Sequence, residues 1–314
     1  MTENKTEQDV PSATPSKGAL GEFPPWLRRP WGSGALFEST RNVVQGYRVH
    51  TVCQSARCPN QGDCWQRRTA TFMILGNVCT RNCLFCSVRS GNPARNVDLE
   101  EPLRVAEAVR ALSIRHAVIT SVTRDDLHDG GAQQFLNTIR AIREINPHTT
   151  VEVLTPDFKG DVNAVRTVAE AYPEVFGHNI ETVERLHAVL RRNGRLYEKS
   201  LSLLRFVSGF SDKIIVKSAL MLGHGETRDE IVKTLQDLRE VGCQVVAMGQ
   251  YLRPTKSQRA VQRYITPDEF QELEQIAYSM GFLFVTAGPF VRSSYRAEEP
   301  ISMLKEKRFG SVAR

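Results

Sequence analysis

The sequence predicts an α/β fold of βα units, with a parallel sheet that is open or closed into a barrel. From Thr69 onward, short apolar runs alternate with amphipathic helical segments. Strict alternation of strand and helix implies right-handed crossovers, and therefore parallel strands. Six such units occupy roughly 180 residues, which indicates a barrel shorter than the eight-fold form.

Two patterns of apolar residues, continuous short runs and helical spacing, define the strands and helices that we expect. The apolar runs that we assign to strands are residues 71–75, 117–121, 151–154, 175–179, 214–220 and 245–249. The segments with apolar residues at i, i+3 and i+4, typical of a helix with one buried stripe, are residues 103–112, 132–145, 162–171, 183–192 and 229–241.

Polar residues stand where several of the predicted strands end. They are Ser121, Asn179 with Glu181, Lys217 and Gln250. In βα barrels the site is built at the C-terminal strand ends, so we expect the chemistry to be located here. The alternative is that strand ends are polar simply because loops begin there.

Composition limits the class of protein. The chain has 314 residues, of which 24% are charged and 41% apolar, as in ordinary globular proteins. The longest uncharged apolar run, residues 279–291, is too short to span a bilayer. Residues 1–17 are polar and lack the apolar core of a secretory signal, so we expect a cytoplasmic location. The net charge of +6 is too small to indicate nucleic-acid binding by itself.

The cysteines carry most of the functional information. Six of the seven lie between Cys53 and Cys86, and the seventh is Cys243. A long chain without a secretory signal can build its own core, which favours metal ligation over a disulfide framework. Cys243 stands at a strand start and is interpreted as a small core residue. Three histidines border apolar runs without a metal-ligand spacing and are interpreted as structural: His50, His116 and His178.

One cysteine triplet, Cys79, Cys83 and Cys86, follows directly on the first predicted strand at spacings of four and three. Three thiolates on a loop can ligate three irons of a cubane iron–sulfur cluster and leave the fourth iron open to a small molecule. The alternative is a three-cysteine zinc site completed by His or Asp. The usual zinc pattern needs a distant second pair of cysteines, and no such pair is present in the sequence.

A second triplet, Cys53, Cys58 and Cys64, lies upstream at spacings of five and six. It precedes the predicted barrel and so cannot belong to the same loop. Three thiols again leave one ligand position unfilled. We therefore expect a second cluster whose fourth ligand comes from elsewhere in the chain.

The downstream loop, CxxxCxxC with Phe85 before its last cysteine, resembles the radical S-adenosylmethionine superfamily. Its pairing with the upstream CxxxxCxxxxxC is similar to the lipoyl synthase family of that superfamily. The family motifs match at residues 50–53, 58–60, 70–76, 120–127, 152–158, 178–182, 249–255 and 291–297. Two small departures, Ala219 where Gly is common and Asn77 where an acid is common nearby, put no motif in doubt.

The resemblance implies a fold and a domain organisation. The core, residues 69–281, is expected to be a partial (β/α)6 TIM-like barrel. Residues 25–68 are expected to form an extension that carries the auxiliary cluster, and residues 282–314, with an Arg-Ser-Ser-Tyr motif, a segment that covers the site. Residues 1–24, rich in Ser, Thr, Lys, Glu and Pro, are expected to be a disordered tail.

The resemblance also implies an activity. Lipoyl synthases are sulfurtransferases that insert two sulfur atoms at C6 and C8 of an octanoyl chain held in amide linkage to a carrier-protein lysine. They use two 4Fe–4S clusters and S-adenosylmethionine, whose 5′-deoxyadenosyl radical removes hydrogen atoms that no acid or base could remove. The auxiliary cluster is the sulfur source. Two alternatives remain: another sulfur-inserting radical enzyme of the biotin synthase type, and a structural metal module that binds nucleic acid through a basic face.

The family's functional residues transfer onto matching positions of this chain. The ligands of the radical cluster would be Cys79, Cys83 and Cys86. The ligands of the auxiliary cluster would be Cys53, Cys58, Cys64 and Ser294, with Ser293 as the alternative serine. The residues expected to bind S-adenosylmethionine are Phe85, Ser121, Asn179, Glu181 and Lys217. Arg292 would orient the substrate.

The implied partners are octanoylated lipoyl carrier proteins, namely E2 lipoyl domains and the glycine-cleavage H protein. An electron donor such as ferredoxin or flavodoxin, and an iron–sulfur carrier that rebuilds the auxiliary cluster, are also implied. Neither nucleic acid nor membrane is expected, and nothing in the sequence requires more than a monomer. Two basic clusters, residues 191–205 and 253–263, are either solvated faces or docking surfaces for an acidic carrier.

Overall fold

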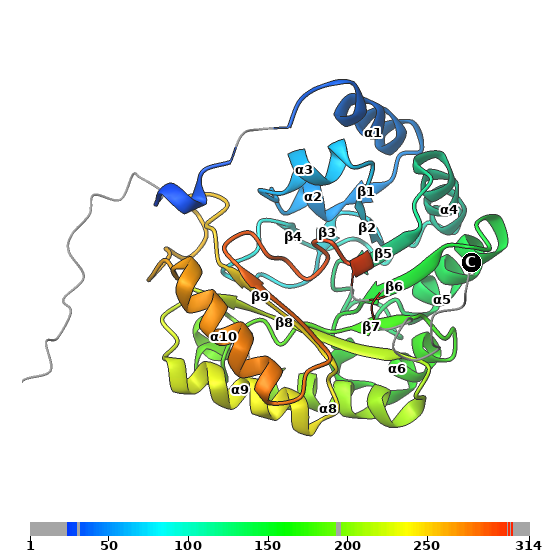
Figure 1. The fold of residues 1–314 in the computed structure, drawn as a ribbon. Coiled ribbons are helices and arrows are strands. Elements are labelled where there is room, and N and C mark those ends of the chain that lie inside the picture. Colours follow the sequence, from blue (N-terminus) through cyan, green and yellow to red (C-terminus); the bar gives the residue numbers. More distant parts are fainter. Residues whose placement is uncertain (1–23, 30–31, 193–195, 300, 302, 304–314) are drawn as a thin grey trace, which may run out of the picture.

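The computed structural model describes residues 24–29, 32–192, 196–299, 301 and 303, and it confirms a partial barrel of the α/β class (Figure 1). The predicted disordered tail lies almost wholly outside the described residues. Figure 1 shows the helices around the outside of a strongly curved sheet. No helix among the described residues combines the length and apolar character that crossing a membrane requires.

The main sheet has eight strands in the order β1-β2-β5-β6-β7-β8-β9-β10, so β1 and β10 are its edges and the barrel is open between them. The seven strands from β2 to β10 in this sheet are parallel to one another and follow their order in the sequence, whereas β1 pairs antiparallel with β2. The strands are β1 His50–Thr51, β2 Thr71–Ile74, β5 His116–Ser121, β6 Thr150–Leu154, β7 Val175–Gly177, β8 Ile215–Leu222, β9 Val245–Gln250 and β10 Phe284–Gly288. A small second sheet pairs β3 Val78–Cys79 with β4 Arg89–Ser90.

The helices cross over between consecutive parallel strands or precede the barrel. The crossover helices are α4 Glu101–Leu112, α5 Ala132–Ile145, α6 Val162–Ala169, α7 Leu186–Val189, α8 Leu196–Phe210, α9 Arg228–Glu240 and α10 Pro267–Ser279. The helices before the barrel are α1 Ala35–Gly46, α2 Val52–Ser55 and α3 Gln61–Gln66. Two 3₁₀ turns are η1 Pro25–Leu27 and η2 Phe158–Gly160.

All six predicted strands are present, but two features of the prediction are wrong. The strand predicted at 175–179 ends at Gly177, so Asn179 follows it. The helix predicted at 183–192 is only the single turn α7, because Arg191 adopts a left-handed backbone with φ of 57° shortly after it. The crossover to β8 is instead completed by α8, which the prediction missed.

The sheet also continues beyond the six predicted strands. Within the apolar run 279–291, Phe284–Gly288 forms β10, parallel to β9 in continuous register. The first residues of four adjacent strands, β7 to β10, form a small apolar cluster with Ile301 of the C-terminal segment: Val175, Ile215, Val245 and Phe284. Ile301 of the C-terminal segment therefore packs against the N-terminal ends of these four strands.

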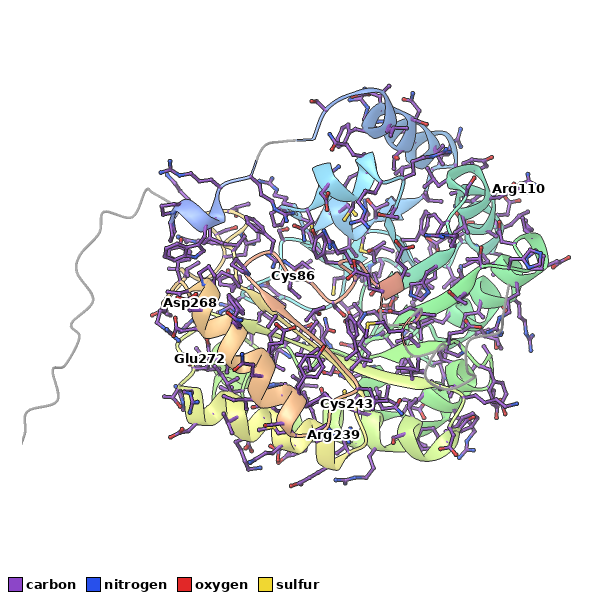
Figure 2. All side chains as sticks on the ribbon, in the orientation of Figure 1. Cys86, Arg110, Arg239, Cys243, Asp268 and Glu272 are labelled. Atoms are coloured by element: carbon purple, nitrogen blue, oxygen red, sulfur yellow. The ribbon has the colours of Figure 1, made fainter. Side chains whose placement is uncertain are left out.

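Cys243 is fully buried, and its thiol lies 3.3 Å from the carbonyl oxygen of Val245. Figure 2 shows it beside Arg239 and away from Cys86, and it stands two residues before β9. The interpretation of Cys243 as a small core residue is confirmed.

Gly249 provides a test of how closely the C-terminal segment approaches the sheet. A Cβ on this β9 residue would lie 2.0 Å from the carbonyl oxygen of Val291, which is backbone and cannot rotate away. We expect Gly249→Ala to lower the free energy of unfolding of the metal-free protein by about 1–3 kcal/mol, measured in urea. Gly46→Ala, at the exposed end of α1 where a Cβ meets nothing, is the matched control and should not destabilise the protein. Equal stability of the two variants would contradict the close approach.

Candidate functional site

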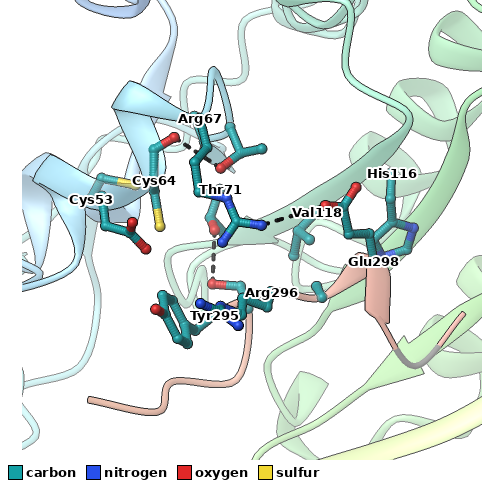
Figure 3. Close-up of a pocket in the computed structure, with 14 residues that line it drawn as sticks. Cys53, Cys64, Arg67, Thr71, His116, Val118, Tyr295, Arg296 and Glu298 are labelled. Carbon is teal, nitrogen blue, oxygen red and sulfur yellow. Dashed lines mark hydrogen bonds and ion pairs between the residues drawn. The ribbon is translucent and has the colours of Figure 1, made fainter. Parts of the chain in front are cut away.

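Three cavities lie in series inside the open barrel. The strand-end cavity, of about 260 Å³, is lined by Cys79, Cys83 and Cys86. The middle chamber, of about 180 Å³, shares Val52, Ala56, Leu154 and Asn179 with it and is lined on its far side by the upstream cysteines. The rear cavity (Figure 3), of about 50 Å³, shares five residues with the middle chamber: Cys53, Cys64, Thr71, Ser294 and Tyr295.

The structure brings the downstream triplet together with four of the five predicted cofactor-binding residues. All of them line the strand-end cavity: Phe85, Ser121, Asn179 and Glu181. They come from the cysteine loop, from the end of β5 and from the loop after β7, so the C-terminal ends of the strands place them on one rim. This is where a βα barrel builds its site.

An ion cluster fixes the cysteine loop to this rim. The Arg81 guanidinium donates to Asp125 at 2.8 Å and to Asp157 at 2.7 Å, and these carboxylates follow β5 and β6. Burial alone would raise the pKa of Asp157, but its bonds to Arg81 outweigh burial and hold the pKa at about 2. The backbone N–H of Arg81 also donates to the sulfur of Cys79 at 3.4 Å. The two carboxylates thus hold the cysteine loop, through Arg81, against the residues that follow β5 and β6. We did not assign these three residues from the sequence, although the two aspartates lie in segments that match the family.

Several buried polar atoms on the rim lack a partner within the described part of the chain. They are Ser121 Oγ, Asn179 Oδ1 and Arg192 Nε. A buried polar group without a partner costs roughly 1–3 kcal/mol, so such atoms together indicate a ligand. Glu181 adds to this because its backbone is left-handed, with φ of 72°, which is rare outside glycine and concentrates at functional sites. Burial raises the pKa of Glu181, and the nearby Arg192 opposes that effect.

Arg192 is a correction to the sequence analysis. We grouped it with a basic cluster that would be a solvated face or a docking surface. In the structure it is 8% exposed and lines the strand-end cavity near Cys83. The residue before it, Arg191, has a left-handed backbone with φ of 57°, which no residue pattern reveals. Arg195 of that cluster lies outside the described residues.

The upstream triplet lies on two short helices and the turn between them. Cys53 is on α2 and Cys64 on α3, and all three thiols line the middle chamber. Burial, and then the neighbouring Cys53 and Cys58, raise the pKa of Cys64 to about 12. Mutual repulsion of this kind requires the thiols to lie close together. The sequence spacing and the structure therefore agree that these cysteines form one group.

The C-terminal segment brings both candidate serines to this group. Ser294 accepts a hydrogen bond from the Thr71 hydroxyl at 2.8 Å, while Ser293 Oγ is buried without a partner among the described residues. Arg292 also lines the middle chamber, donating to the carbonyl of Val291 at 2.7 Å. The predicted substrate residue and the predicted auxiliary ligands thus face one space.

Both cysteine groups are spread around their cavities. In the described part of the chain, no three His, Cys, Asp or Glu side chains converge as they would around a single metal ion. In a cubane cluster each thiolate binds a different iron, so its cysteines are spread around the cluster rather than drawn to one point.

Lys217 is not brought to the rim with the other predicted cofactor-binding residues. It stands early in β8, and its ammonium donates to Glu152 at 2.8 Å inside the barrel. The other oxygen of Glu152 lies 3.3 Å from His116, which also bonds Thr150. Burial raises the pKa of Glu152, but Lys217 and His116 outweigh it and lower the pKa below its usual value. His116 is therefore structural, as predicted.

His178 bonds the carbonyl of Thr155 and the hydroxyl of Ser200, which also confirms a structural role, although it borders the strand-end cavity. His50 is the first residue of β1. In the second basic cluster, Arg259 is tied to the cysteine loop through the carbonyl of Leu84, whereas Lys256 and Arg263 are exposed.

Known proteins resemble this chain over most of its length. The family model described as "Radical SAM superfamily" matches residues 73–238 of this chain. A lipoyl synthase of Rubrobacter xylanophilus is 49% identical over 304 residues, covering 93% of this chain and 94% of that protein. A lipoyl synthase of Pyrobaculum arsenaticum is 52% identical over 286 residues, covering 90% and 96%.

Solved structures resemble the fold alone. HydG, a maturase of the FeFe-hydrogenase, superposes with a TM-score of 0.53 at 12% identity, covering 81% of this chain and 69% of that chain. Streptococcus suis SuiB bound to S-adenosylmethionine superposes with a TM-score of 0.52 at 11% identity, covering 69% and 49%.

The buried pair of Lys217 and Glu152 has a testable energetic signature. Lys217→Met removes the ammonium partner of the buried Glu152 carboxylate and leaves it only the contact with His116, so we expect a loss of roughly 3–5 kcal/mol in the free energy of unfolding. Glu152→Met should cost a similar amount. The double variant Lys217→Met/Glu152→Met removes both charges and should be more stable than either single variant. A urea-unfolding cycle in which the two losses simply add would contradict this coupling.

Proposed function

The chain belongs to the lipoyl synthase family of the radical S-adenosylmethionine superfamily. We propose that its strand-end cavity and its middle chamber divide sulfur insertion into an octanoyl chain between them. The strand-end cavity would hold the radical cluster and S-adenosylmethionine. The middle chamber would hold the octanoyl chain, and its far wall the auxiliary cluster. The observation that carries this proposal is the shared lining, which places the chamber directly between the two cysteine groups.

The rim residues suit the polar parts of S-adenosylmethionine. The Arg192 guanidinium is a buried cation beside Cys83 and fits the methionine carboxylate. Ser121 Oγ and Asn179 Oδ1 have unused hydrogen-bonding capacity for the amine and the ribose hydroxyls. Glu181, held toward the cavity by its strained backbone, is the carboxylate available to a cationic or hydroxyl group.

The middle chamber suits an alkyl chain. Its wall between the two cysteine groups is apolar, formed by Val52, Ala56 and Leu154. When bound, the clusters and S-adenosylmethionine supply hydrogen-atom abstraction and sulfide, which no side chain can supply. The chain's own residues position the reacting carbon between the groups and exclude water and stray hydrogen donors. Arg292, on the far wall, can bond the amide that links the octanoyl group to its lysine.

Ser294 suits the fourth position of the auxiliary cluster. It is held on the chamber wall by Thr71 and lies in the group formed by the three cysteines. A hard oxygen donor on a soft iron–sulfide core is expected to leave more readily than a thiolate, which fits a cluster that is consumed.

The exposed cations near the cysteine loop suit an acidic carrier. Lys256 and Arg263 lie on the loop whose Arg259 N–H binds the carbonyl of Leu84 in the cysteine loop. Charge complementarity there would steer a lipoyl domain or H protein toward the chamber. A ferredoxin or flavodoxin as electron donor, and an iron–sulfur carrier, complete the proposed set of partners.

Replacing cysteines one at a time tests the division of roles. We expect Cys53→Ala to abolish sulfur insertion into an octanoyl-lysine peptide while S-adenosylmethionine cleavage continues. We expect Cys79→Ala to abolish both. Cys243→Ala, which removes a buried thiol outside the cavities, should retain both and serves as the control. The measurement is anaerobic mass spectrometry of peptide and 5′-deoxyadenosine, and cleavage without insertion by the unaltered enzyme would contradict the proposed reaction.

Adjacent arginines give a matched test of the rim. Arg192→Met removes the proposed partner of the methionine carboxylate, and we expect S-adenosylmethionine to bind about 10–100-fold more weakly. Arg191→Met changes an exposed neighbour and should leave the affinity unchanged. The measurement is equilibrium binding to the cluster-loaded protein. Equal affinities for the two variants would remove Arg192 from the site.

A further inference from the structure

The cysteine loop is held by a second element besides the ion cluster, namely the loop that follows β9. We call residues 251–263 the β9 loop. The backbone N–H of its Arg259 donates to the carbonyl of Leu84 at 2.8 Å. The side-chain amide of its Gln258 donates to the carbonyl of Cys86 at 3.2 Å. The β9 loop therefore binds two carbonyl groups of the cysteine loop, and one of them belongs to its last cysteine.

The cysteine loop depends on such donors because it has little regular structure of its own. Residues 80–88, between β3 and β4, form neither helix nor strand. A single turn bond, from the Cys86 N–H to the Cys83 carbonyl at 3.1 Å, closes the last part of the loop. Backbone groups in an irregular segment find their partners in neighbouring elements. The position of Cys86 therefore depends on the donors that these elements supply.

The β9 loop is itself fixed to the barrel at its base. The buried side chain of Gln250, at the end of β9, donates to the carbonyls of Leu222 and Arg263, each at 3.1 Å. It also accepts from the backbone N–H of Ile265 at 2.8 Å. One amide thus connects the end of β8 with both ends of the loop. Gln250 is one of the polar residues at the predicted strand ends, and the structure shows that it braces this loop.

Two hydroxyl groups determine the orientation of the Gln258 amide. Gln258 Oε1 accepts from the Thr255 hydroxyl at 2.5 Å and from the Ser257 hydroxyl at 3.2 Å. With its oxygen occupied, the amide presents its NH₂ group to the Cys86 carbonyl. The main chain is held as well, since the Gln258 carbonyl accepts from Arg253 Nε at 2.7 Å. The donor is thus held in one position by its own loop.

A fixed donor beside a cluster ligand has two effects on the cluster. Hydrogen-bonded partners of a ligand orient it toward the metal. Reduction adds one negative charge to an iron–sulfur cluster, and hydrogen bonds and nearby charge set its reduction potential. The positive end of an N–H dipole at the peptide of Cys86 therefore stabilises the reduced state over the oxidised one.

We propose that Gln258 is a positioning residue of the radical cluster, whose amide fixes the backbone at Cys86 and makes the cluster easier to reduce. This inference rests on the proposed function, since it requires a cluster on the downstream cysteines. Gln258 is not among the residues that line the strand-end cavity. It therefore acts through Cys86 and not by contact with S-adenosylmethionine.

The experiment uses the full chain with Cys53→Ala, Cys58→Ala and Cys64→Ala, so that a cluster can form only at the downstream cysteines. Electron paramagnetic resonance counts the reduced cluster during an anaerobic potentiometric titration. We expect Gln258→Leu to lower the equilibrium constant of reduction about two- to tenfold, since one hydrogen-bond donor is lost. A tenfold change lowers a one-electron potential by about 59 mV.

Two charged variants separate the electrostatic role from a merely structural one. Gln258→Glu keeps the shape of the side chain but replaces the donor by a negative charge, so it should lower the potential further than Gln258→Leu. Gln258→Lys supplies a cation and should raise the potential. Gln262→Leu is the matched control, because Gln262 is an exposed glutamine of the same loop whose amide donates to the carbonyl of Ala260. It should leave the potential unchanged.

The outcomes of this titration are distinguishable. A potential that rises in the order Gln258→Glu, Gln258→Leu, unaltered residue and Gln258→Lys is the expected result. Unchanged potentials in all three variants, or a shift in the same direction for the acidic and the basic variant, would overturn the role of Gln258 while leaving the proposed function intact. A background protein that binds no reducible cluster would instead refute the proposed radical site.

Discussion

The structure depends on how the open barrel is filled. Its edge strands, β1 and β10, do not meet, so the interior would be accessible to water between them. The two ends of the chain fill this opening together. Asn60 donates to the carbonyl of Phe290 at 2.7 Å and accepts from Arg29 at 2.9 Å, while the Arg29 guanidinium lies 4.2 Å from the centre of the Phe290 ring. These contacts bring the upstream cysteines and the serines, which are far apart in the sequence, onto one wall.

Charge inside the barrel is organised in layers. At the rim, the half-buried Arg81 and the buried Arg192 lie next to the downstream cysteines, and two aspartates compensate Arg81. Deeper in the barrel, Lys217 and Glu152 compensate each other. The middle chamber, between the rim and the auxiliary wall, has only one charged side chain apart from its cysteines, that of Arg292. Arg192 lies close enough to Glu181 for their charges to interact, but its buried Nε has no hydrogen-bond partner among the described residues, so hydrogen-bonding capacity is left unused at the rim.

The features that a local sequence pattern determines, namely the strands and the cysteine groups, could be predicted from the sequence. Continuous apolar runs identified six strands, and the cysteine spacings identified two groups that the structure places on two connected cavities. Lys217 shows the limit of this reasoning. As a polar residue within a predicted strand it could be assigned to the rim, but β8 extends to Leu222 and places Lys217 near its start, opposite a carboxylate of another strand. Such a partner, 65 positions away, is set by topology and register rather than by any local pattern.

The two cysteine groups differ in how firmly the fold holds them. The downstream loop is fixed by part-buried ion pairs to the residues that follow two barrel strands. The upstream group stands on α2 and α3, helices of four and six residues that are too short to be stable without tertiary contacts. Its serine comes from a segment held at discrete points: Thr71, Asn60 and the apolar base around Ile301. A cluster that persists from one turnover to the next is best served by the first design. A cluster that is dismantled and replaced needs ligands that can separate and reassemble without unfolding the barrel, and the second design provides them.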